Sequence, residues 1–355
     1  MLKSLGSVPV DKAEAAGAKA SEPLLVVAGP TCSGKSALAM RLAQAFGGCV
    51  INADAMQLYR GLRVLTARPD ALEAAAVPHR LYGILPPWRK GTVAGWCALA
   101  VGEISAARSQ EQLPVLCGGT GMYLNALAHG LADVPSPTAE ARAEARTLCK
   151  QLGSGGLHAK LSLADPETAL RLRPQDPQRV IRAWEVWRST GHGLAWWWRE
   201  AESRAFRARY IFILLDPPRD ALRAAIRKRF GAMVRHGALE EVRALENELA
   251  AAGRLEDELP LLRAHGVPEL RAVLAGAMTL EEAADAATRA TVRYTKRQAT
   301  WFRHHPLGAV SDRLVLQARF ENPHAPSAEM EGVWRQVADF LQARLGMRFE
   351  SGLKR

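Results

Sequence analysis

The sequence predicts an α/β fold in which a parallel sheet carries a helical insertion domain. Short, almost wholly apolar runs alternate with longer segments in which apolar residues recur every three or four positions. Such alternation is typical of a doubly wound parallel sheet, because parallel strands need a crossover between them. A long stretch, 133–207, has the helical pattern alone and lies between two of the apolar runs, which indicates an insertion.

Five apolar runs are predicted to be the strands of the sheet. Each is apolar along nearly its whole length, as expected for a parallel strand buried on both faces. Intervening segments such as KSALAMRLAQAF have the pattern of helices. Beyond residue 216 we expect only helices, apart from a loop at about 260–268. The predicted strands are 24–29, 49–53, 81–85, 114–119 and 210–216.

These patterns divide the chain into four parts. Residues 1–22, rich in Ala, Gly, Ser and Lys, are expected to form a flexible N-terminal tail. The α/β core comprises 23–132 and 208–320, with helices at its C-terminal end, and the helical insertion occupies 133–207. Residues 321–355 are expected to form a C-terminal helix and tail.

The segment GPTCSGKS follows the first predicted strand, precedes a helix pattern, and fits the phosphate-binding motif G-x-x-x-x-G-K-[ST]. In this motif the backbone N–H groups and the helix N-terminus surround a phosphate. Lys35 supplies a full charge and the Ser36 hydroxyl can bind Mg²⁺. The motif and its context together favour a P-loop NTPase-like core over a plain turn. The predicted anion-binding residues are Gly29, Pro30, Thr31, Cys32, Ser33, Gly34, Lys35 and Ser36.

An acidic side chain, Asp54, follows the second predicted strand in the stretch INADAMQLYRGL. A carboxylate at the carboxyl end of a parallel strand lies where such sheets bind ligands. The other interpretation is a cap for a helix that begins in AMQLY, and position alone does not decide between them. The fourth run ends in LCGGTGMY, without the Asp that commonly helps a P-loop NTPase to hold Mg²⁺.

The chain has 355 residues and a formal net charge of +11 at pH 7, which favours an anionic partner such as nucleic acid over a merely basic surface. Its five cysteines form no C-x-x-C pair, and no histidines stand at metal-finger spacing. We therefore expect free thiols in a reducing cytoplasm. No apolar run is long enough for a signal peptide or a membrane span, so we expect neither.

Six segments, in this order, resemble the tRNA dimethylallyltransferase family, the isopentenyl-diphosphate:tRNA transferases that prenylate the adenosine just 3′ of the anticodon. The segments are GPTCSGKS, NADAMQLYRGLRVLTARP, PHRLYGI, LCGGTGMYLNAL, DPQRVIRAWEVWRSTG and TKRQATWFR. They extend over about 24–305, and only the first is common elsewhere, so the ordered set is specific. The chain departs from the family at Ala55, where the family usually has Ser, and in HGVPEL at 265–270.

The resemblance implies that the phosphate-binding loop holds the diphosphate of dimethylallyl diphosphate, with Mg²⁺ as cofactor at Ser36 and with Arg229 as a further diphosphate ligand. Asp54 matches the family's general base, and Thr120 matches a threonine that contacts tRNA near the reaction centre. The implied enzyme is a cytoplasmic monomer that binds the tRNA anticodon stem-loop. The residues expected to contact tRNA are Asp54, Ala55, Met56, Gln57, Thr120, Arg142, Gln178, Arg179, Val180, Ile181, Arg182 and Arg297.

Basic and aromatic residues gather between residues 176 and 230, where twelve Arg or Lys stand against six acids. This mixture suits a single-stranded RNA loop. Trp184 and Trp187, at i and i+3, are expected to pack within the insertion. Among Trp196, Trp197 and Trp198 we expect at least one exposed ring.

A second basic segment, TRATVRYTKRQATWFRHH, spaces its cations as one stripe of a helix. Charge alone does not distinguish a stripe that binds RNA or diphosphate from a helix face that is only solvated. The resemblance favours contact with RNA or diphosphate by Arg297 and Arg303. The residues of the stripe are Arg289, Arg293, Lys296 and Arg297.

Two other functions fit parts of the sequence. A P-loop small-molecule kinase would bind ATP through the same loop, but the acid-free end of the fourth run and the basic insertion argue against it. A non-catalytic RNA-binding protein with a relic loop is argued against by the intact Lys35, Ser36 and Asp54.

Overall fold

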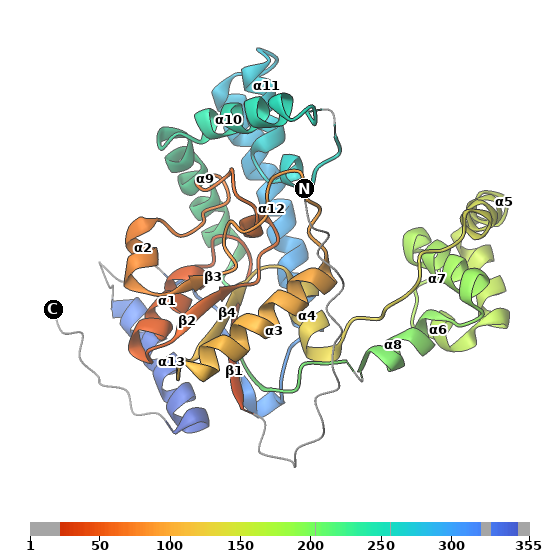
Figure 1. Cartoon of the computed structure of the whole chain (residues 1–355), viewed down its shortest axis with the longest axis horizontal. Coiled ribbons are helices and arrows are strands. Elements are labelled where there is room, and N and C mark those ends of the chain that lie inside the picture. Colours follow the sequence, from red (N-terminus) through yellow and green to blue (C-terminus); the bar gives the residue numbers. More distant parts are fainter. Residues whose placement is uncertain (1–21, 203, 256, 321–327, 347–355) are drawn as a thin grey trace, which may run out of the picture.

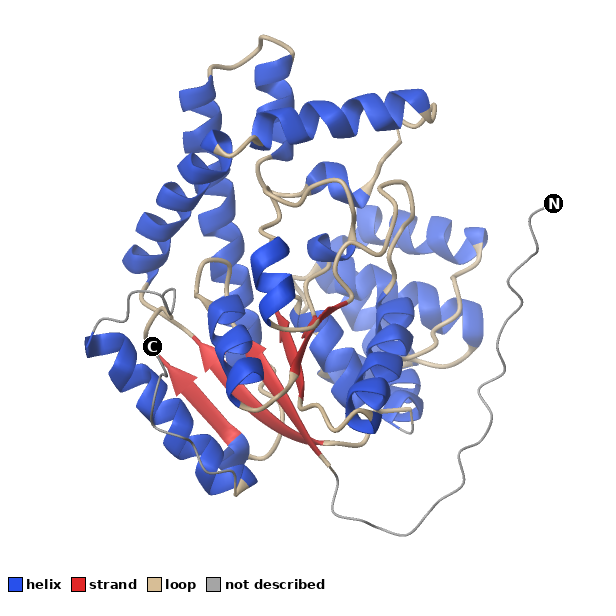
Figure 2. Cartoon of the chain, turned by 60° about the vertical axis from the view of Figure 1, so that its left-hand side comes forward, coloured by secondary structure: helices blue, strands red, loops and turns tan. Residues whose placement is uncertain are grey.

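The structure, a computed structural model, describes residues 22–202, 204–255, 257–320 and 328–346. A six-stranded sheet forms the centre of the molecule, with helices on both of its faces (Figures 1 and 2). The strands follow the order β3-β2-β4-β1-β5-β6, and every neighbouring pair is parallel. The predicted α/β class with a parallel sheet is confirmed. The predicted N-terminal tail, apart from residue 22, lies outside the described residues.

Four of the five predicted strands are confirmed, and the third is wrong. Residues 81–85 run as a loop joined to the sheet region by one bridge between Tyr59 and Leu85. Leu81 and Gly83 both have positive φ, 63° and 64°, which breaks the extended geometry that their apolar pattern suggests. The strands are β1 (Pro23–Ala28), β2 (Cys49–Asn52), β3 (His79–Arg80), β4 (Pro114–Gly118), β5 (Arg209–Leu215) and β6 (Arg313–Leu316).

The edge strand β6 contradicts the expectation of helices alone beyond residue 216. It has four residues, of which only Leu316 is buried, so it lacks the apolar run of a central strand. The expected loop at 260–268 is also partly wrong, because it contains a 3₁₀ turn, η2 (Pro260–Arg263), and the start of α11 (Val267–Leu274).

The helices cover the two faces of the sheet and form the insertion (Figure 2). In the described part of the chain, none of them is long and apolar enough to cross a membrane. Those of the first half are α1 (Lys35–Ala45), α2 (Ala71–Ala76), α3 (Val93–Ser109), α4 (Gly121–His129), α5 (Ala139–Ala164), α6 (Pro166–Leu170), α7 (Pro177–Thr190) and α8 (Leu194–Glu202). Those of the second half are α9 (Arg219–Arg235), α10 (Ala238–Ala251), α11, α12 (Leu280–His304) and α13 (Ala328–Leu345). Two further 3₁₀ turns are η1 (Met56–Leu58) and η3 (Val310–Asp312).

Strand β1 shows why its sequence is apolar at every position. Leu24 and Val26 point into the core shared with α3, α4, α9 and α12, whereas Leu25 and Val27 point into the core shared with α1 and α13. All four side chains are buried. Burial of one such side chain stabilises a fold by about 1.5–3 kcal/mol, so both faces fix the position of β1 and of the loop that follows it.

Helices α5 to α8 lie to one side of the sheet (Figure 1). They have a buried cluster of their own, in which α5 packs against α7. Gly153, with φ 71°, interrupts the helical backbone of α5. The clustered side chains include Leu157, Leu161, Val180 and Trp184.

The tryptophans of this region pack more fully than the sequence suggests. Trp184 is buried and its ring lies 5.2 Å from that of Trp187, as expected. The expectation of an exposed ring in the Trp triplet is wrong, because all three are half-buried. Trp197 and Trp198 pack against the cluster of α5 to α8, and Trp196 stacks on His192 with ring centroids 4.2 Å apart.

Candidate active site

The segments that follow β2, β4 and β1 meet at one edge of the sheet. These three strands are neighbours and parallel, so their carboxyl ends lie together. Asp54 follows β2, Thr120 follows β4, and the phosphate-binding loop, 29–36, follows β1. The sheet topology therefore brings together three elements that the sequence separates by up to about ninety residues.

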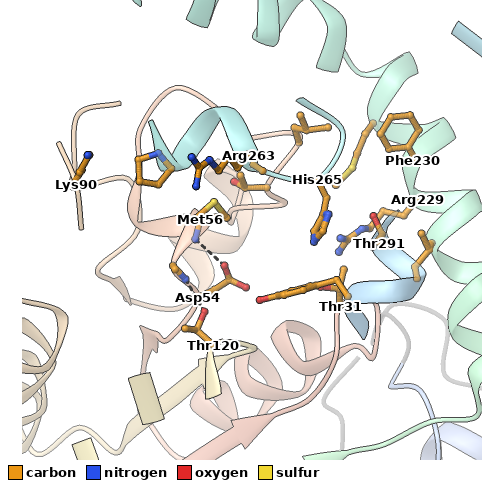
Figure 3. A pocket seen from close by; sticks show the side chains of 18 of the residues that line it. Thr31, Asp54, Met56, Lys90, Thr120, Arg229, Phe230, Arg263, His265 and Thr291 are labelled. Carbon is orange, nitrogen blue, oxygen red and sulfur yellow. Dashed lines mark hydrogen bonds between the residues drawn. The ribbon is translucent and has the colours of Figure 1, made fainter. Parts of the chain in front are cut away.

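A cavity of about 620 Å³ lies at this edge. Asp54 and Thr120 lie on one side of it, and Arg229 and His265 lie on the opposite side (Figure 3). Thr31 of the phosphate-binding loop also lines it. The rest of the wall is largely apolar, and its apolar side chains include Leu65, Ile226, Phe230 and Met233.

The backbone around Asp54 is fixed by the fully buried Asn52. The Asn52 Oδ1 accepts a hydrogen bond from the Asp54 N–H at 2.8 Å, and its Nδ2 donates to the carbonyls of Asp54 and Leu81, both at 3.0 Å. One Asp54 carboxylate oxygen accepts from the Met56 N–H at 3.0 Å (Figure 3). Asp54 thus holds the first turn of η1 and also lines the cavity, so both sequence-based interpretations describe part of its geometry.

Thr120 joins the loop after β4 to the loop after β2. Its hydroxyl oxygen accepts from the Ala55 N–H at 3.0 Å, and its own N–H donates to the Ala53 carbonyl at 3.2 Å. A threonine hydroxyl that accepts one bond still has its proton to donate. Thr120 can therefore donate to a molecule in the cavity while it positions Ala55 beside Asp54.

The phosphate-binding loop has a conformation that requires glycine at Gly34. Its φ is 91°, and a Cβ there would lie 1.7 Å from the carbonyl oxygen of Phe320. The segment after β6 holds this part of the loop. The Arg319 guanidinium donates to the Cys32 carbonyl at 3.0 Å, and the Phe320 N–H donates to the Ser33 carbonyl at 2.9 Å.

Only part of the predicted loop is available to an anion. Pro30 has no N–H to donate. The Thr31 N–H donates to the Gln298 side chain at 2.9 Å, and the Ser33 N–H donates to the Pro30 carbonyl at 3.1 Å. Ser33 is fully buried, so its hydroxyl faces the interior. Within the described part of the chain, no partner is found for the N–H groups of Cys32, Gly34, Lys35 and Ser36.

His265 and Tyr294 are cavity residues for which the sequence offered no signal beyond the unusual HGVPEL stretch. Their rings lie 4.8 Å apart. Burial lowers the pKa of His265; Glu269 and Asp54 raise it, whereas Arg229 and Arg293 lower it further. The imidazole is therefore neutral at neutral pH. Burial raises the pKa of Tyr294, and Asp54 adds to that effect.

The cavity rim carries further cations that the sequence did not single out. Lys90 and Arg263 line the cavity together with Glu258, and Arg263 pairs with Glu258 at 2.8 Å. With Arg229 these groups give the cavity three basic side chains against the two carboxylates of Asp54 and Glu258. The excess of positive charge suits an anionic ligand.

The residues expected to contact tRNA through α5 and α7 lie outside this cavity. Arg142, Gln178 and Arg179 are exposed, and Ile181 and Arg182 are half-buried. Val180 is fully buried in the cluster of α5 to α8, so its side chain does not reach the surface that its neighbours Arg179 and Arg182 share. Its place in the amphipathic pattern of α7 is on the buried face.

Two other residues that were expected to contact RNA or diphosphate, Gln57 and Arg303, bond to residues of the same chain. Gln57 donates to the carbonyls of Thr66 and Ala67 at 2.9 and 2.8 Å, so its amide holds a neighbouring loop. The Arg303 guanidinium makes two hydrogen bonds to the Asp216 carboxylate, at 2.9 and 3.1 Å, and is thereby neutralised.

The remaining basic residues of α12 differ in position. Arg297 is exposed and close enough to lower the pKa of Tyr294 at the cavity. Arg289 and Arg293 line a second, separate cavity between α9 and α12. The stripe expected from the sequence is therefore shared between two surfaces.

Comparison with known proteins places this chain in a family. The sequence profile described as IPP transferase matches residues 57–305. The chain belongs to the IPP transferase family. Among its relatives, a tRNA dimethylallyltransferase of Gluconobacter oxydans (strain 621H) is 52% identical over 321 residues, which is 90% of this chain and 94% of the relative. One of Granulibacter bethesdensis (strain ATCC BAA-1260 / CGDNIH1) is 54% identical over 295 residues, 83% of this chain and 91% of the relative.

Solved structures of the family agree with the fold. The crystal structure of a full-length tRNA isopentenylpyrophosphate transferase from Bacillus halodurans has a TM-score of 0.61 and 30% identity, and the match covers 92% of this chain and 98% of that one. A eukaryotic dimethylallyltransferase acting on tRNA has a TM-score of 0.72 at 23% identity, over 93% of this chain and 81% of that one. This second likeness shows that the two chains share a fold.

Proposed function

We propose that this IPP transferase family member transfers a dimethylallyl group from dimethylallyl diphosphate to the exocyclic N6 of the adenosine just 3′ of the anticodon in tRNA, and releases diphosphate. One observation carries the proposal. A single cavity has a carboxylate, Asp54, on one side and the basic side chain of Arg229, with Thr31 of the phosphate-binding loop, elsewhere in its wall. This is the pair of groups that alkyl transfer to an amine needs.

The chemistry explains why both groups are required. The N6 lone pair of adenine is delocalised into the ring, so the amine attacks the prenyl carbon effectively only if its proton is removed. The bond between that carbon and the diphosphate oxygen breaks as the new carbon–nitrogen bond forms, and negative charge develops on the leaving diphosphate. We assign proton acceptance to Asp54 and the hydrogen bond that orients the adenine to Thr120.

The anion clamp would consist of groups that the structure leaves available. These are the N–H groups of 34–36 at the start of α1, the Lys35 ammonium and the Arg229 guanidinium. The apolar wall with Leu65, Phe230 and Met233 suits a five-carbon prenyl chain and excludes water from the reacting atoms.

The described residues can hold Mg²⁺ through one hydroxyl together with the substrate diphosphate. Among the described residues, no three His, Cys, Asp or Glu side chains gather to hold a metal ion. Mg²⁺ commonly uses one or two protein ligands, substrate phosphates and water. Ser36 is an exposed residue at the first turn of α1, and its hydroxyl, which also bonds to the Cys117 thiol, has an oxygen lone pair that can be such a ligand. Bound there, Mg²⁺ would offset negative charge on the diphosphate.

The insertion at 133–207 is proposed to bind the tRNA anticodon stem-loop. Among the described residues of the insertion, five basic side chains between 176 and 207 form ion pairs, for example Arg179 with Asp176 and Arg188 with Glu144. The arginine side chains of these pairs are 41–66% exposed, and ion pairs at the surface are weak, so these cations can exchange a carboxylate for a phosphate.

Binding of tRNA is therefore expected to weaken steeply with salt. Each phosphate neutralised adds about −0.7 to −0.9 to the slope of log affinity against log salt, so three contacts give about −2. Filter binding or fluorescence anisotropy at several salt concentrations measures the slope. The exposed Arg142, on α5, is expected to lower its magnitude by about one when changed to Ala. The control is Arg254→Ala, since the Arg254 guanidinium pairs with Asp257 beyond α10. This substitution should leave the slope of log affinity against log salt unchanged.

The proposed activity separates from the kinase alternative in one assay. The protein is incubated with labelled dimethylallyl diphosphate and unmodified tRNA, with and without ATP. Transfer of label to tRNA without ATP is expected, because the prenyl diphosphate itself supplies the leaving group. ATP hydrolysis without label transfer would support a kinase or ATPase, and binding of tRNA with neither activity would support a non-catalytic RNA-binding protein.

A further inference from the structure

We infer that Gln298 is a positioning residue, whose side chain sets the distance between the leaving-group side and the acceptor side of the reaction. The inference rests on the proposed function and adds a residue to which neither the sequence motifs nor the cavity lining gives a role. Gln298 lies on α12 and is 4% exposed.

Both ends of the Gln298 amide are used by the two loops that carry the chemistry. Its Oε1 accepts from the N–H of Thr31, in the phosphate-binding loop, at 2.9 Å. Its Nε2 donates to the carbonyl of Gly119, the residue before Thr120, at 3.0 Å. An amide supplies the acceptor and the donor that this arrangement needs, and it carries no net charge at any pH.

The chain of hydrogen bonds continues from Gly119 to the loop that carries Asp54, the proposed proton acceptor. Thr120 accepts from the Ala55 N–H and donates its own N–H to Ala53, on either side of Asp54. Gln298 therefore links the phosphate-binding loop, the Thr120 loop and the Asp54 loop through hydrogen bonds that are all 3.2 Å or shorter. Nothing else is needed to connect the leaving-group clamp to the proton acceptor.

The Gln298 amide packs closely against the backbone of Gly119. A Cβ at Gly119 would lie 2.3 Å from the Gln298 Nε2, so glycine is required for the amide to approach the carbonyl. Below the site, Phe302 on the next turn of α12 is buried in the core. A buried amide that lost one partner would leave a polar group unsatisfied, which favours a single arrangement of the two loops.

The reaction should be sensitive to this link. A misplacement of reacting groups by about 1 Å can cost on the order of 10²-fold in rate. Gln298→Leu keeps the approximate volume and removes both hydrogen bonds. We expect its single-turnover rate of prenyl transfer, at saturating diphosphate and tRNA, to fall on the order of 10²-fold. The affinity for tRNA should stay within about threefold, because the surfaces of α5 and α7 are untouched.

Gln298→Glu provides a readout that a merely structural role would not move. A neutral carboxyl has an acceptor oxygen and an O–H donor, and so reproduces the amide, whereas a carboxylate cannot donate to Gly119. Burial beside the Gly119 carbonyl raises the pKa of a carboxyl, so protonation falls within an accessible range. The rate of this variant, divided by the wild-type rate at the same pH, is expected to rise at least tenfold between pH 8 and pH 6.

Other titrating groups are present around Gln298 and explain why the ratio is used. Cys32 and Lys35 lie on the phosphate-binding loop, Asp54 follows β2, and Arg297 precedes Gln298 on α12. Burial raises the pKa of Cys117, on β4, to about 11, so that thiol stays neutral. These groups occur in both proteins, and their titration cancels in the ratio.

The matched control is Thr295→Val on the same helix. Thr295 is as buried as Gln298, but its hydroxyl donates only to the Val292 carbonyl within α12. Its rate should equal that of the wild type. A Gln298→Leu rate equal to the wild type, an equal loss in Thr295→Val, or a Gln298→Glu ratio that does not change with pH would each overturn the inference. Absence of transfer by the wild type would instead overturn the proposed function.

Discussion

Asp54→Asn is expected to lower the single-turnover rate of prenyl transfer on the order of 10²-fold or more, with both substrates still bound. The Asn side chain keeps the size of Asp and keeps an oxygen to accept from the Met56 N–H, now at 3.0 Å. What it loses is the ability to take the proton from N6. Rapid-quench measurement with labelled dimethylallyl diphosphate at saturating tRNA reports the chemical step directly.

The control for this substitution is Asp70→Asn. Asp70 also accepts backbone N–H groups, those of Leu72 and Glu73, but it caps the exposed helix α2 away from the cavity. Asn caps a helix as well as Asp does, so this variant should be silent in rate and in stability. If Asp54→Asn were equally silent, within about threefold of the wild-type rate, Asp54 would be a structural cap and the proton acceptor would be another group.

Lys35→Ala is expected to weaken binding of the diphosphate substrate by about 10- to 150-fold, while the affinity for tRNA stays unchanged. A charge-assisted hydrogen bond contributes about 1.5–3 kcal/mol, which corresponds to that range. The Lys35 ammonium is available for such a bond, because its hydrogen bond to the Pro30 carbonyl is long, 3.5 Å. Isothermal titration with inorganic diphosphate measures the effect without the chemical step.

Lys228→Ala serves as the comparison, since Lys228 is exposed on α9 beside Arg229 but does not line the cavity. It removes the same charge from the protein and should leave the diphosphate affinity unchanged. A Lys35→Ala protein with wild-type affinity for diphosphate would show that the loop after β1 binds some other group. The melting temperatures of both variants should match that of the wild type, because neither side chain is buried.

The parts of the fold that the sequence predicted correctly are those with a strong local pattern. The phosphate-binding loop has a complete motif, and β1, β2, β4 and β5 are buried on both faces and hence continuously apolar. The failures have physical causes that no local pattern shows. Leu81 adopts a positive φ inside an apolar run, and β6 is a short edge strand with one buried residue.

The site was predicted less completely, because its parts meet through long-range contacts. Asp54 was placed at the edge of the sheet because it follows a predicted strand, whereas Thr120 was identified through the family resemblance. The bond between Thr31 and Gln298 joins residues 267 positions apart, and no spacing rule connects them. His265 enters the cavity from the segment that the sequence suggested was a loop, and burial, rather than a motif, makes it neutral. Val180 was named with its whole segment, and the sequence did not show that its own side chain faces the core.

The measurement that tests the proposed function most directly identifies the nucleoside that receives the prenyl group. Unmodified tRNA is incubated with the protein and labelled dimethylallyl diphosphate without ATP, then digested to nucleosides and analysed by chromatography and mass spectrometry. We predict that all label is found on N6 of the adenosine just 3′ of the anticodon, and that tRNA with guanosine at that position receives none. Label at another nucleoside, equal labelling of the guanosine-substituted tRNA, or no transfer to either tRNA would contradict the proposed function.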